Sequence, residues 1–307
     1  MMNEHLYSIV VPVFNSGKTL VELNSRIHTV MKQHNFNFEI IYVDDGSFDD
    51  SWSILEKLKS ECPDSLKAIR LARNFGQHNA TFCGLDHASG DIIITIDDDL
   101  QVPPEEIPKL IGSYHENDAD LVYGCFQKKQ HSLIRNIGSR LLKKAGAFFN
   151  DAPGEGSSFR LFTKDLSVKI LSHSQNFVFI DELLLWYTAN ICFVNVKHNR
   201  RKEGKSGYTT IRLLRLLANL IFHYSALPLK IMTYGGLISS VILFFTGLYF
   251  FIRWLFFDVP VGNTSIIIAV LFSASVIIFC IGVVGEYINR LYMIHNKKPP
   301  YSIRKIL

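Results

Sequence analysis

The five cysteines of this 307-residue chain are scattered along it, and no two of them form a CxxC pair. The sequence therefore predicts neither a disulfide framework nor a zinc site, which favours a reducing compartment for its polar part. GxGxxG and GxxxxGK[ST] are also absent, which excludes the common dinucleotide fingerprint and the P-loop. The chain starts without the basic segment and long apolar stretch of a signal peptide. Its net charge of +4 is mild, and we expect no nucleic-acid partner.

Long apolar runs, by contrast, are present near the carboxyl end. Hydrophobic residues make up 48% of the chain, which is high for a soluble protein and indicates a membrane portion. Residues 231–257 contain one charge, Arg253, and residues 265–284 contain none. Each run exceeds the ~20 residues needed to cross a bilayer core. With the short connection between them they predict a transmembrane hairpin, and a buried core helix is the alternative.

The basic residues indicate how this hairpin is oriented. They are frequent in residues 197–215, before the first run, and again from Arg290 to Lys305, after the second. The positive-inside rule then places both ends of the hairpin and the large domain in the cytoplasm. The expected parts are a cytoplasmic domain (1–208), amphipathic helices on the membrane surface (209–230), two transmembrane helices (231–292, the spans being about 231–257 and 265–287) and a cytoplasmic tail (293–307).

The first 200 residues alternate short apolar, β-branched runs with helical stretches. The runs that predict strands are 7–13, 38–43, 66–71, 92–96, 121–123, 158–162 and 191–196. A first helix is expected to follow the turn at 14–17 and to end at about residue 34, and further helices are expected over 51–61, 77–88 and 177–187. This alternation predicts βαβ units and a mostly parallel sheet. In such sheets, ligands bind at the carboxyl ends of the strands.

Polar residues stand at each of the expected strand ends. They are Asn15, Asp44 with Asp45, Arg73 with Asn74, and the triplet 97–99. Asp97 and Asp99 point the same way in an extended chain. Their oxygen ligands favour Mg²⁺ or Mn²⁺ over zinc. A solvated acidic loop is the alternative, and the triplet alone does not decide between the two.

A metal bound by acids at such an edge suggests a substrate that carries phosphate. The basic residues 200–205 supply further positive charge for phosphates, or they interact with anionic lipid at a membrane surface. Asp44 and Asp45 are suited to accept hydrogen bonds from a base or ribose, and a helix cap or an Asx-turn is the alternative.

Five segments together resemble family-2 glycosyltransferases. They are VVPVFN (10–15), VDDGS (43–47), RNFGQHNA (73–80), DDDLQVPPE (97–105) and RKEGKSGY (201–208). Their order and spacing are similar to the polyprenyl-phosphate glycosyltransferase group, which includes dolichol-phosphate mannose synthase, bactoprenol glucosyltransferases and the undecaprenyl-phosphate aminoarabinose transferases. The resemblance covers essentially the whole chain, and the two apolar runs resemble those of the bacterial members.

This resemblance implies a Rossmann-like, glycosyltransferase A-type fold and the inverting, metal-dependent transfer of a single sugar. The sugar would pass from a nucleotide-diphosphate sugar, expected to be of the UDP type, to a polyprenyl phosphate. It further implies a multi-pass protein of the bacterial inner membrane that serves cell-envelope biogenesis, and it leaves homo-oligomer formation open. The absence of QxxRW argues for transfer of one sugar at a time.

The family's functional residues are carried over by motif. Asp97, Asp99 and Gln101 would bind Mg²⁺ or Mn²⁺, with Asp99 counted as catalytic. Residues expected to contact the nucleotide sugar are Pro12, Asn15, Asp44, Asp45, Arg73, Gly76, Asp97 and Asp98. Residues expected to contact phosphates are Arg160, Arg201, Lys205 and Ser206.

The sequence departs from the family pattern at three places. Ser16 follows Asn15 where the family often has Glu, Gly207 replaces a lysine, and Ser158 precedes Phe159-Arg160 where many members have an acid. That acid is dispensable as a base, because a lipid monophosphate has a second pKa of about 6 and is ionised at pH 7. Asp181 and Glu182 remain as candidate bases or sugar contacts, and exposed helix surface is the alternative.

Two further interpretations stay open. One is a transferase that acts on a hydroxyl of a glycolipid or a lipid-linked saccharide, which would need a base. The other is a degenerate, membrane-anchored protein that only binds sugar nucleotides. The intact Asp97, Asp99 and Gln101 argue against the second.

Overall fold

The computed structural model describes residues 5–126, 157–172, 179–199, 263–295 and 299–307, together with scattered positions between 232 and 256. The chain divides into two compact units. One comprises Met1–Lys205 and Pro299–Leu307, and the other comprises Ser206–Lys298.

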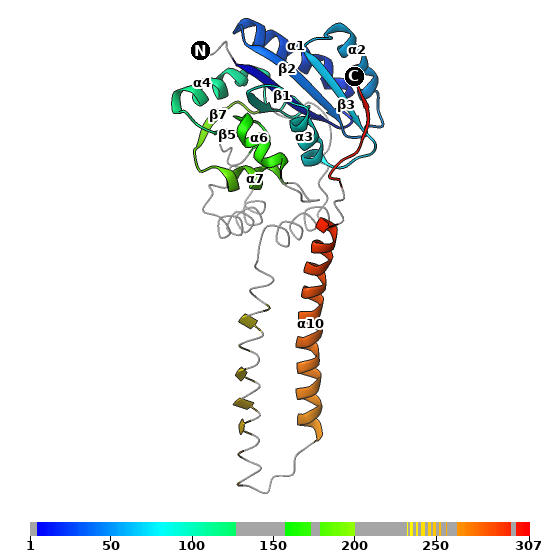
Figure 1. The fold of residues 1–307 in the computed structure, drawn as a ribbon, viewed down its shortest axis with the longest axis vertical. Helices are drawn as coiled ribbons and strands as arrows, with labels where there is room; N and C mark the ends of the chain where they lie inside the picture. Colours follow the sequence, from blue (N-terminus) through cyan, green and yellow to red (C-terminus); the bar gives the residue numbers. More distant parts are fainter. Residues whose placement is uncertain are drawn as a thin grey trace. The chain divides into compact units, whose positions relative to one another are not determined.

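The first unit is built on an eight-stranded sheet with the strand order β7-β5-β6-β4-β1-β2-β3-β8 (Figure 1). β1 is parallel to β2 and β4, and β2 is parallel to β3. β6 runs antiparallel to both β4 and β5, and β8 runs antiparallel to β3. The strands are β1 (Leu6–Val13), β2 (Asn37–Asp44), β3 (Leu66–Leu71), β4 (Ile92–Thr95), β5 (Leu121–Phe126), β6 (Arg160–Thr163), β7 (Ile191–Val196) and β8 (Ile303–Ile306).

The central strands are buried on both faces. Every residue of β4 and all but the first of β1 are buried. Both strands are continuous runs rich in Val and Ile, which suit a sheet that helices cover on each side. The helices are α1 (Gly17–Gln33), α2 (Ser51–Glu61), α3 (Gln77–Asp86), α4 (Ile107–Asn117), α6 (Lys164–Leu171) and α7 (Ile180–Tyr187), with a 3₁₀ turn η1 (Pro104–Glu106).

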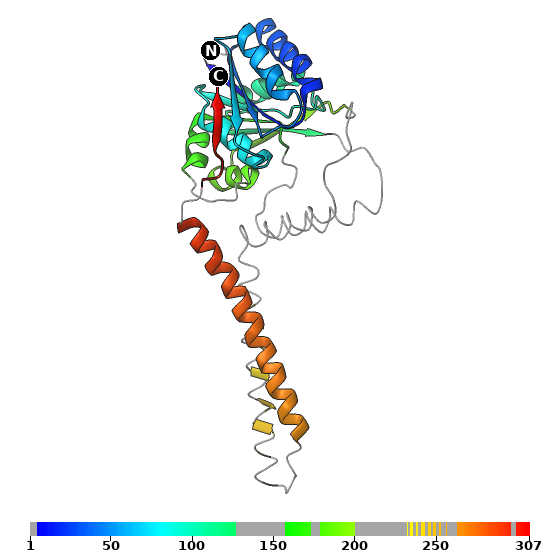
Figure 2. The same cartoon turned by 90° about the vertical axis from the view of Figure 1, so that its right-hand side faces the viewer.

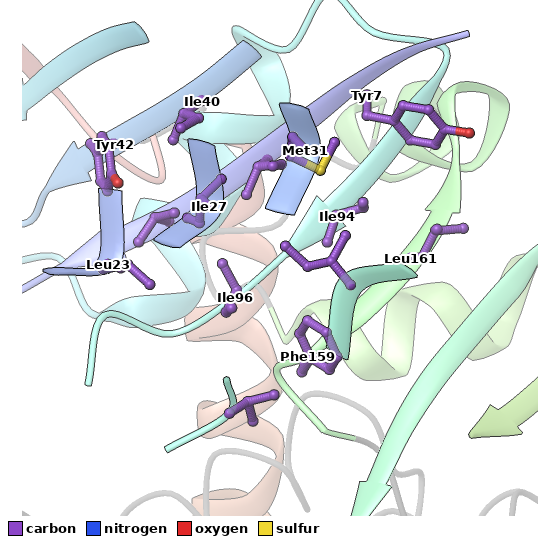
Figure 3. Packing of buried hydrophobic residues seen from close by; sticks show 14 of the residues in the cluster. Tyr7, Leu23, Ile27, Met31, Ile40, Tyr42, Ile94, Ile96, Phe159 and Leu161 are labelled. Carbon is purple, nitrogen blue, oxygen red and sulfur yellow. The ribbon is translucent and has the colours of Figure 1, made fainter. Parts of the chain in front are cut away.

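Helices cover both faces of this sheet. On one face, Leu23, Ile27 and Met31 of α1 pack against Ile40 and Ile94, which point from β2 and β4 into the same core (Figure 3). α2 and α4 contribute to that core as well. On the opposite face α3 lies against β1 and β2. This arrangement confirms the expected Rossmann-like, mostly parallel sheet.

The carboxyl-terminal residues, expected to be a tail, form β8 at the edge of the sheet (the red arrow in Figure 2). The Ala72 amide donates to the Ser302 carbonyl at 2.8 Å, and the Leu307 amide donates to the Ala68 carbonyl at 2.9 Å. Lys305 Nζ lies 2.8 Å from Glu56 Oε1. Pairing with β8 satisfies backbone groups of β3 that an open edge would leave exposed.

The second unit contains α10 (Asn263–His295), a helix of 33 residues that includes the second expected span. Within the part of the chain that the structure describes, we find no helix with both the length and the apolar character needed to cross a membrane. Residues 209–230 lie outside the described residues, and only scattered positions of 231–257 are described.

Candidate functional site

The carboxyl ends of β4, β1 and β2 lie side by side, because these three neighbouring strands are parallel. Val13 at the end of β1 is opposite Asp44 at the end of β2. The segments that follow these strands, 14–16, 45–47 and 96–101, therefore share one edge of the sheet. This is the edge at which the sequence predicts a ligand.

Asn15 joins the first two of these segments. Its backbone has a φ of 54°, in the left-handed region that Asn tolerates better than most residues. Its amide donates to Ser47 Oγ at 2.9 Å, and its side-chain oxygen accepts from the Phe48 amide at 2.9 Å. The rings of Phe14 and Phe48 meet edge to face, with centroids 6.4 Å apart. Phe48 is 88% exposed, so its ring is available for stacking.

Asp44 and Asp45 are both buried and are occupied by neighbours within the protein. Asp44 accepts a hydrogen bond from the Ser47 amide at 3.0 Å, and its other oxygen lies 3.2 Å from Arg70 Nε without hydrogen-bond geometry. Asp45 accepts from the amides of Phe75 and Gly76 at 2.7 and 2.8 Å. Burial raises the pKa of Asp45 to about 6, although these two hydrogen bonds oppose the rise.

The turn after β3 is shaped by Gly76, whose φ of 94° disfavours residues with a side chain. Asp45 holds this turn against the end of β2. Arg73 is exposed, and its guanidinium lies 4.8 Å from the centre of the Phe75 ring. Arg73 and Gly76, which are expected to contact the nucleotide sugar, thus belong to the turn that Asp45 binds.

Asp97 faces α3 and the start of β6. Its carboxylate accepts hydrogen bonds from Gln77 Nε2 at 2.7 Å and Ser158 Oγ at 2.5 Å. Burial raises the pKa of Asp97, and the negative charge of Asp99 acts in the same direction. Both hydrogen-bond donors are neutral, so the negative charge is only partly compensated.

Asp98 points the other way, towards the turn between β1 and α1. It accepts from the Phe14 amide at 3.0 Å and from Ser16 Oγ at 2.5 Å. Burial raises the pKa of Asp98 to about 7. Its carboxylate thus holds the protein's own turn, whereas the sequence led us to expect a contact with the nucleotide sugar.

The expected metal ligands are Asp97, Asp99 and Gln101, at the end of β4. In the described ranges, no three His, Cys, Asp or Glu side chains come together closely enough to hold an ion. Asp99 accepts from the Gln101 amide at 3.0 Å, and Gln101 Oε1 lies 3.2 Å from His198 Nε2. Two carboxylates and an amide oxygen fit Mg²⁺ or Mn²⁺ when substrate phosphates complete the coordination, which is the usual manner of Mg²⁺ binding.

Arg160 and Asp181 form an ion pair next to Asp97. The Arg160 side chain is only 3% exposed, and its Nε donates to Thr95 Oγ1 at 3.2 Å. The Tyr123 hydroxyl donates to Asp181 at 3.2 Å. Arg160 was expected to bind phosphate, and Asp181 to act as a base or to contact the sugar; in the structure the two side chains neutralise each other. Glu182 follows Asp181 on α7 and does not line the cavity beside Asp97.

A cavity of about 190 Å³ opens beside Asp97, between the ends of α3, β4, β6 and α7. This volume is below the roughly 300–1,000 Å³ of a complete small-molecule site, so the cavity would hold one part of a larger ligand. Its lining residues are Pro12, Gln77, His78, Thr81, Thr95, Ile96, Asp97, Ser158, Arg160, Phe179 and Asp181.

Sequence reasoning assigned no role to Gln77, His78 or Phe179, and it noted Ser158 only as a departure from the family pattern. The sequence feature that could have identified Gln77 and His78 is their position directly after the strand-end turn that contains Gly76. The predicted phosphate ligands Arg201, Lys205 and Ser206 lie outside the described residues.

Comparisons with known proteins agree with this site. The family model "Glycosyl transferase family 2" matches residues 8–173, and the model "GtrB C-terminal hairpin" matches residues 227–291. The undecaprenyl-phosphate 4-deoxy-4-formamido-L-arabinose transferase of Shewanella sediminis is 32% identical over 99% of this chain and 93% of that protein. The Salmonella choleraesuis protein of the same name is 31% identical over 98% of this chain and 93% of its own length.

Solved structures show the same fold at low sequence identity. Glucosyl-3-phosphoglycerate synthase from Mycobacterium tuberculosis, in complex with phosphoglyceric acid, has a TM-score of 0.52 at 18% identity and covers 71% of this chain and 79% of its own. The same enzyme with Mn²⁺ and UDP-glucose has a TM-score of 0.50 at 18% identity, with 71% of this chain and 78% of that chain covered.

Proposed function

Because this chain belongs to glycosyl transferase family 2 and is therefore a glycosyltransferase, we propose that it transfers one sugar from a nucleotide-diphosphate sugar to undecaprenyl phosphate or a similar polyprenyl phosphate. The observation that carries the proposal is the convergence of Asn15, Asp45, Asp97 and Asp99 on one edge of the sheet. The names of the relatives, which are similar over nearly the whole chain, supply the acceptor.

The nucleoside of the donor lies at the ends of β1 and β2. Pro12, Asn15, Asp44 and Asp45 border this place, and the exposed ring of Phe48 offers a face on which a base can stack. The solved enzyme with UDP-glucose supports a UDP-type donor as the first choice to test.

The diphosphate of the donor lies at Asp97 and Asp99. These carboxylates, with Gln101, are the residues that would hold Mg²⁺ or Mn²⁺, and the only partly compensated charge of Asp97 beside Asp99 supports this assignment. A bound divalent cation offsets the negative charge that develops on the leaving diphosphate. Arg201, Lys205 and Ser206 add phosphate contacts, on the strength of the sequence motif alone.

The transfer is inverting and uses no strong general base. Asp181 is paired with Arg160. The positive charge of the guanidinium stabilises the ionised carboxylate and so weakens Asp181 as a base. The acceptor is a phosphate with a second pKa of about 6, which is already a nucleophile at neutral pH. Its ionised oxygen attacks the anomeric carbon as the diphosphate leaves from the opposite side.

The protein works at the cytoplasmic face of a bacterial inner membrane, held by a hairpin in residues 231–292. The match of residues 227–291 to a hairpin family supports this location. So do the exposed apolar side chains of α10, among them Ile266, Val270, Ile277 and Ile288. The basic residues on either side of the hairpin support cytoplasmic termini.

The test uses the purified full-length chain, undecaprenyl phosphate, Mg²⁺ or Mn²⁺ and a panel of nucleotide sugars. We expect a glycosylated lipid phosphate, detected by mass spectrometry, with at least one donor. Asp99→Asn should lower the rate by about 100-fold or more, the usual effect of losing charge stabilisation of this kind. Asp64→Asn, at an exposed acid away from the site, is the matched control.

Two outcomes would overturn parts of this proposal. No lipid product with any donor would remove the proposed acceptor. A product on a glycolipid hydroxyl, but not on undecaprenyl phosphate, would favour the alternative acceptor class and restore the need for a base.

A further inference from the structure

We propose that the cavity beside Asp97 receives the transferred sugar and that His78 determines sugar specificity through a hydrogen bond to one of its polar substituents. The inference rests on the proposed function and concerns a residue of the segment 73–80 to which the sequence assigned no role. The relevant residues are His78 and its neighbours in the cavity wall: Asp97, Arg160, Phe179 and Asp181.

His78 is placed where it can contact a ligand. It is the second residue of α3, directly after Gln77, which donates to Asp97. Its ring packs against Phe179 with centroids 4.6 Å apart and an angle of 52° between the planes. Among the described residues, no side chain forms a hydrogen bond with the His78 ring. Both ring nitrogens are thus uncommitted in a cavity that they help to line.

The charges of the cavity wall favour a neutral ligand. Arg160 is paired with Asp181, and Asp97 is the residue assigned to the metal and the diphosphate, so the rest of the wall carries no net charge. Burial lowers the pKa of His78 to about 4, so its imidazole is neutral at pH 7 and adds no positive charge. A phosphate would meet no excess of positive charge from these residues, whereas a neutral imidazole both donates to and accepts from a hydroxyl.

The shape and composition of the wall also suit a sugar. Phe179 and Ile96 provide apolar surface for the C–H faces of a pyranose, and Ser158, Thr81 and His78 provide polar atoms for its hydroxyls. The volume of about 190 Å³ is small for a whole nucleotide sugar. Asp97 forms one wall, so a sugar seated here is next to the place assigned to the diphosphate.

The test compares binding of UDP with binding of the UDP-sugar that the wild-type enzyme uses fastest in the panel above. Calorimetry on the full-length protein with Mn²⁺ gives both dissociation constants for the wild type, His78→Phe and His78→Gln. We expect His78→Phe to bind UDP within about twofold of the wild type but the UDP-sugar about tenfold more weakly, as for loss of one buried hydrogen bond. His78→Gln keeps a hydrogen-bonding group, so its affinity for the UDP-sugar should lie between that of the wild type and that of His78→Phe.

His78→Phe keeps a ring against Phe179, which protects the packing, and a melting curve of each variant monitors folding. His34→Phe, at an exposed histidine at the end of α1, controls for the substitution itself. A change in the order of preference among sugars in the His78 variants also supports the inference.

Wild-type turnover tests the proposed function, and the variants test this inference separately. If the wild type makes product and His78→Phe has unchanged affinity for the UDP-sugar, the inference is overturned while the proposed function stands. If UDP and the UDP-sugar lose affinity equally in a folded variant, His78 supports the fold of the site and does not read the sugar.

Discussion

Three neighbouring aspartates at the end of β4 have different surroundings. Asp97 is bound by Gln77 and Ser158, Asp98 by the turn after β1, and Asp99 by the Gln101 amide. Asp98 and Asp99 lie in a turn after β4, and Asp98 is directed towards the segment 14–16, whereas Asp97 is directed towards Gln77 and Ser158. Burial consequently raises the pKa of both Asp97 and Asp98 above that of an ordinary aspartate.

At the residue scale, Asp181→Asn should destabilise the protein. The substitution leaves the guanidinium of Arg160 buried without its partner, which costs roughly 3–5 kcal/mol of the free energy of unfolding. Chemical unfolding followed by fluorescence measures the loss. Asp165→Asn removes an exposed pair with Lys169 and should change the free energy of unfolding far less, because solvent screens such a pair. Full stability of Asp181→Asn together with loss of transfer would instead indicate a catalytic role.

Asp45 should make stability depend on pH. Its pKa is 3.8 when unperturbed and about 6 in the folded protein, so the folded state binds more protons between these values. The free energy of unfolding therefore falls as pH rises from about 4 to about 6, by at most about 3 kcal/mol. Unfolding of the wild type and of Asp45→Asn across pH 4 to 8 tests this. A difference between the two that does not change with pH would contradict it.

At the element scale, the close packing of α3 on β1 depends on Gly84. A Cβ at this position would lie well inside van der Waals distance of Val10 Cγ1 and 3.3 Å from Val43 Cγ2. α3 also begins with Gln77 and His78, which line the cavity. A displacement of this helix would thus reach the site as well as the core.

We expect Gly84→Ala to lower the free energy of unfolding by about 1–3 kcal/mol, because overpacked side chains must shift. It should also slow sugar transfer. Gly112→Ala is the matched control, since a Cβ in the middle of α4 meets nothing within 4 Å. That change should stabilise the protein by about 0.5 kcal/mol through the unfolded chain. Equal stability of the two variants, measured by denaturant unfolding, would show that α3 adapts freely.

At the scale of the whole molecule, the first unit is discontinuous in sequence. Its last strand, β8, follows the residues of the second unit and pairs with β3. Tyr301 also contacts this unit, with its hydroxyl 2.7 Å from Asp86 Oδ2. The second unit, Ser206–Lys298, is therefore inserted in sequence between the two segments of the first unit.

A chain that ends at residue 205 should consequently be less stable than one in which a flexible linker of about 30 residues replaces residues 206–298. Only the second chain can pair β8 with β3. Hydrogen exchange reports this directly, because the amides of Ala68 and Ala72 donate to Leu307 and Ser302. Equal melting temperatures and equal protection of these amides would show that β8 contributes nothing.

Local sequence determined most of the first unit. Apolar, β-branched runs between turn residues predicted the strands, with β3 and β7 matching residue for residue. The parallel topology then followed from the alternation with helices, and it brought the polar strand ends to one edge. Side-chain alternation predicted that Asp98 points away from Asp97, and the two carboxylates do have different partners, although Asp98 lies in a turn and not in an extended strand. These features depend on neighbours in sequence, which is why sequence patterns predict them.

Tertiary structure alone decided the contacts between distant segments. β8 is four residues long and pairs with a strand more than 200 residues earlier, so no local pattern marks it. The pairing of Arg160 with Asp181, and the opening of His78 into a cavity, require α3, β4, β6 and α7 to meet. Such meetings depend on how helices pack across the sheet. Packing is a property of the assembled core and not of any one segment.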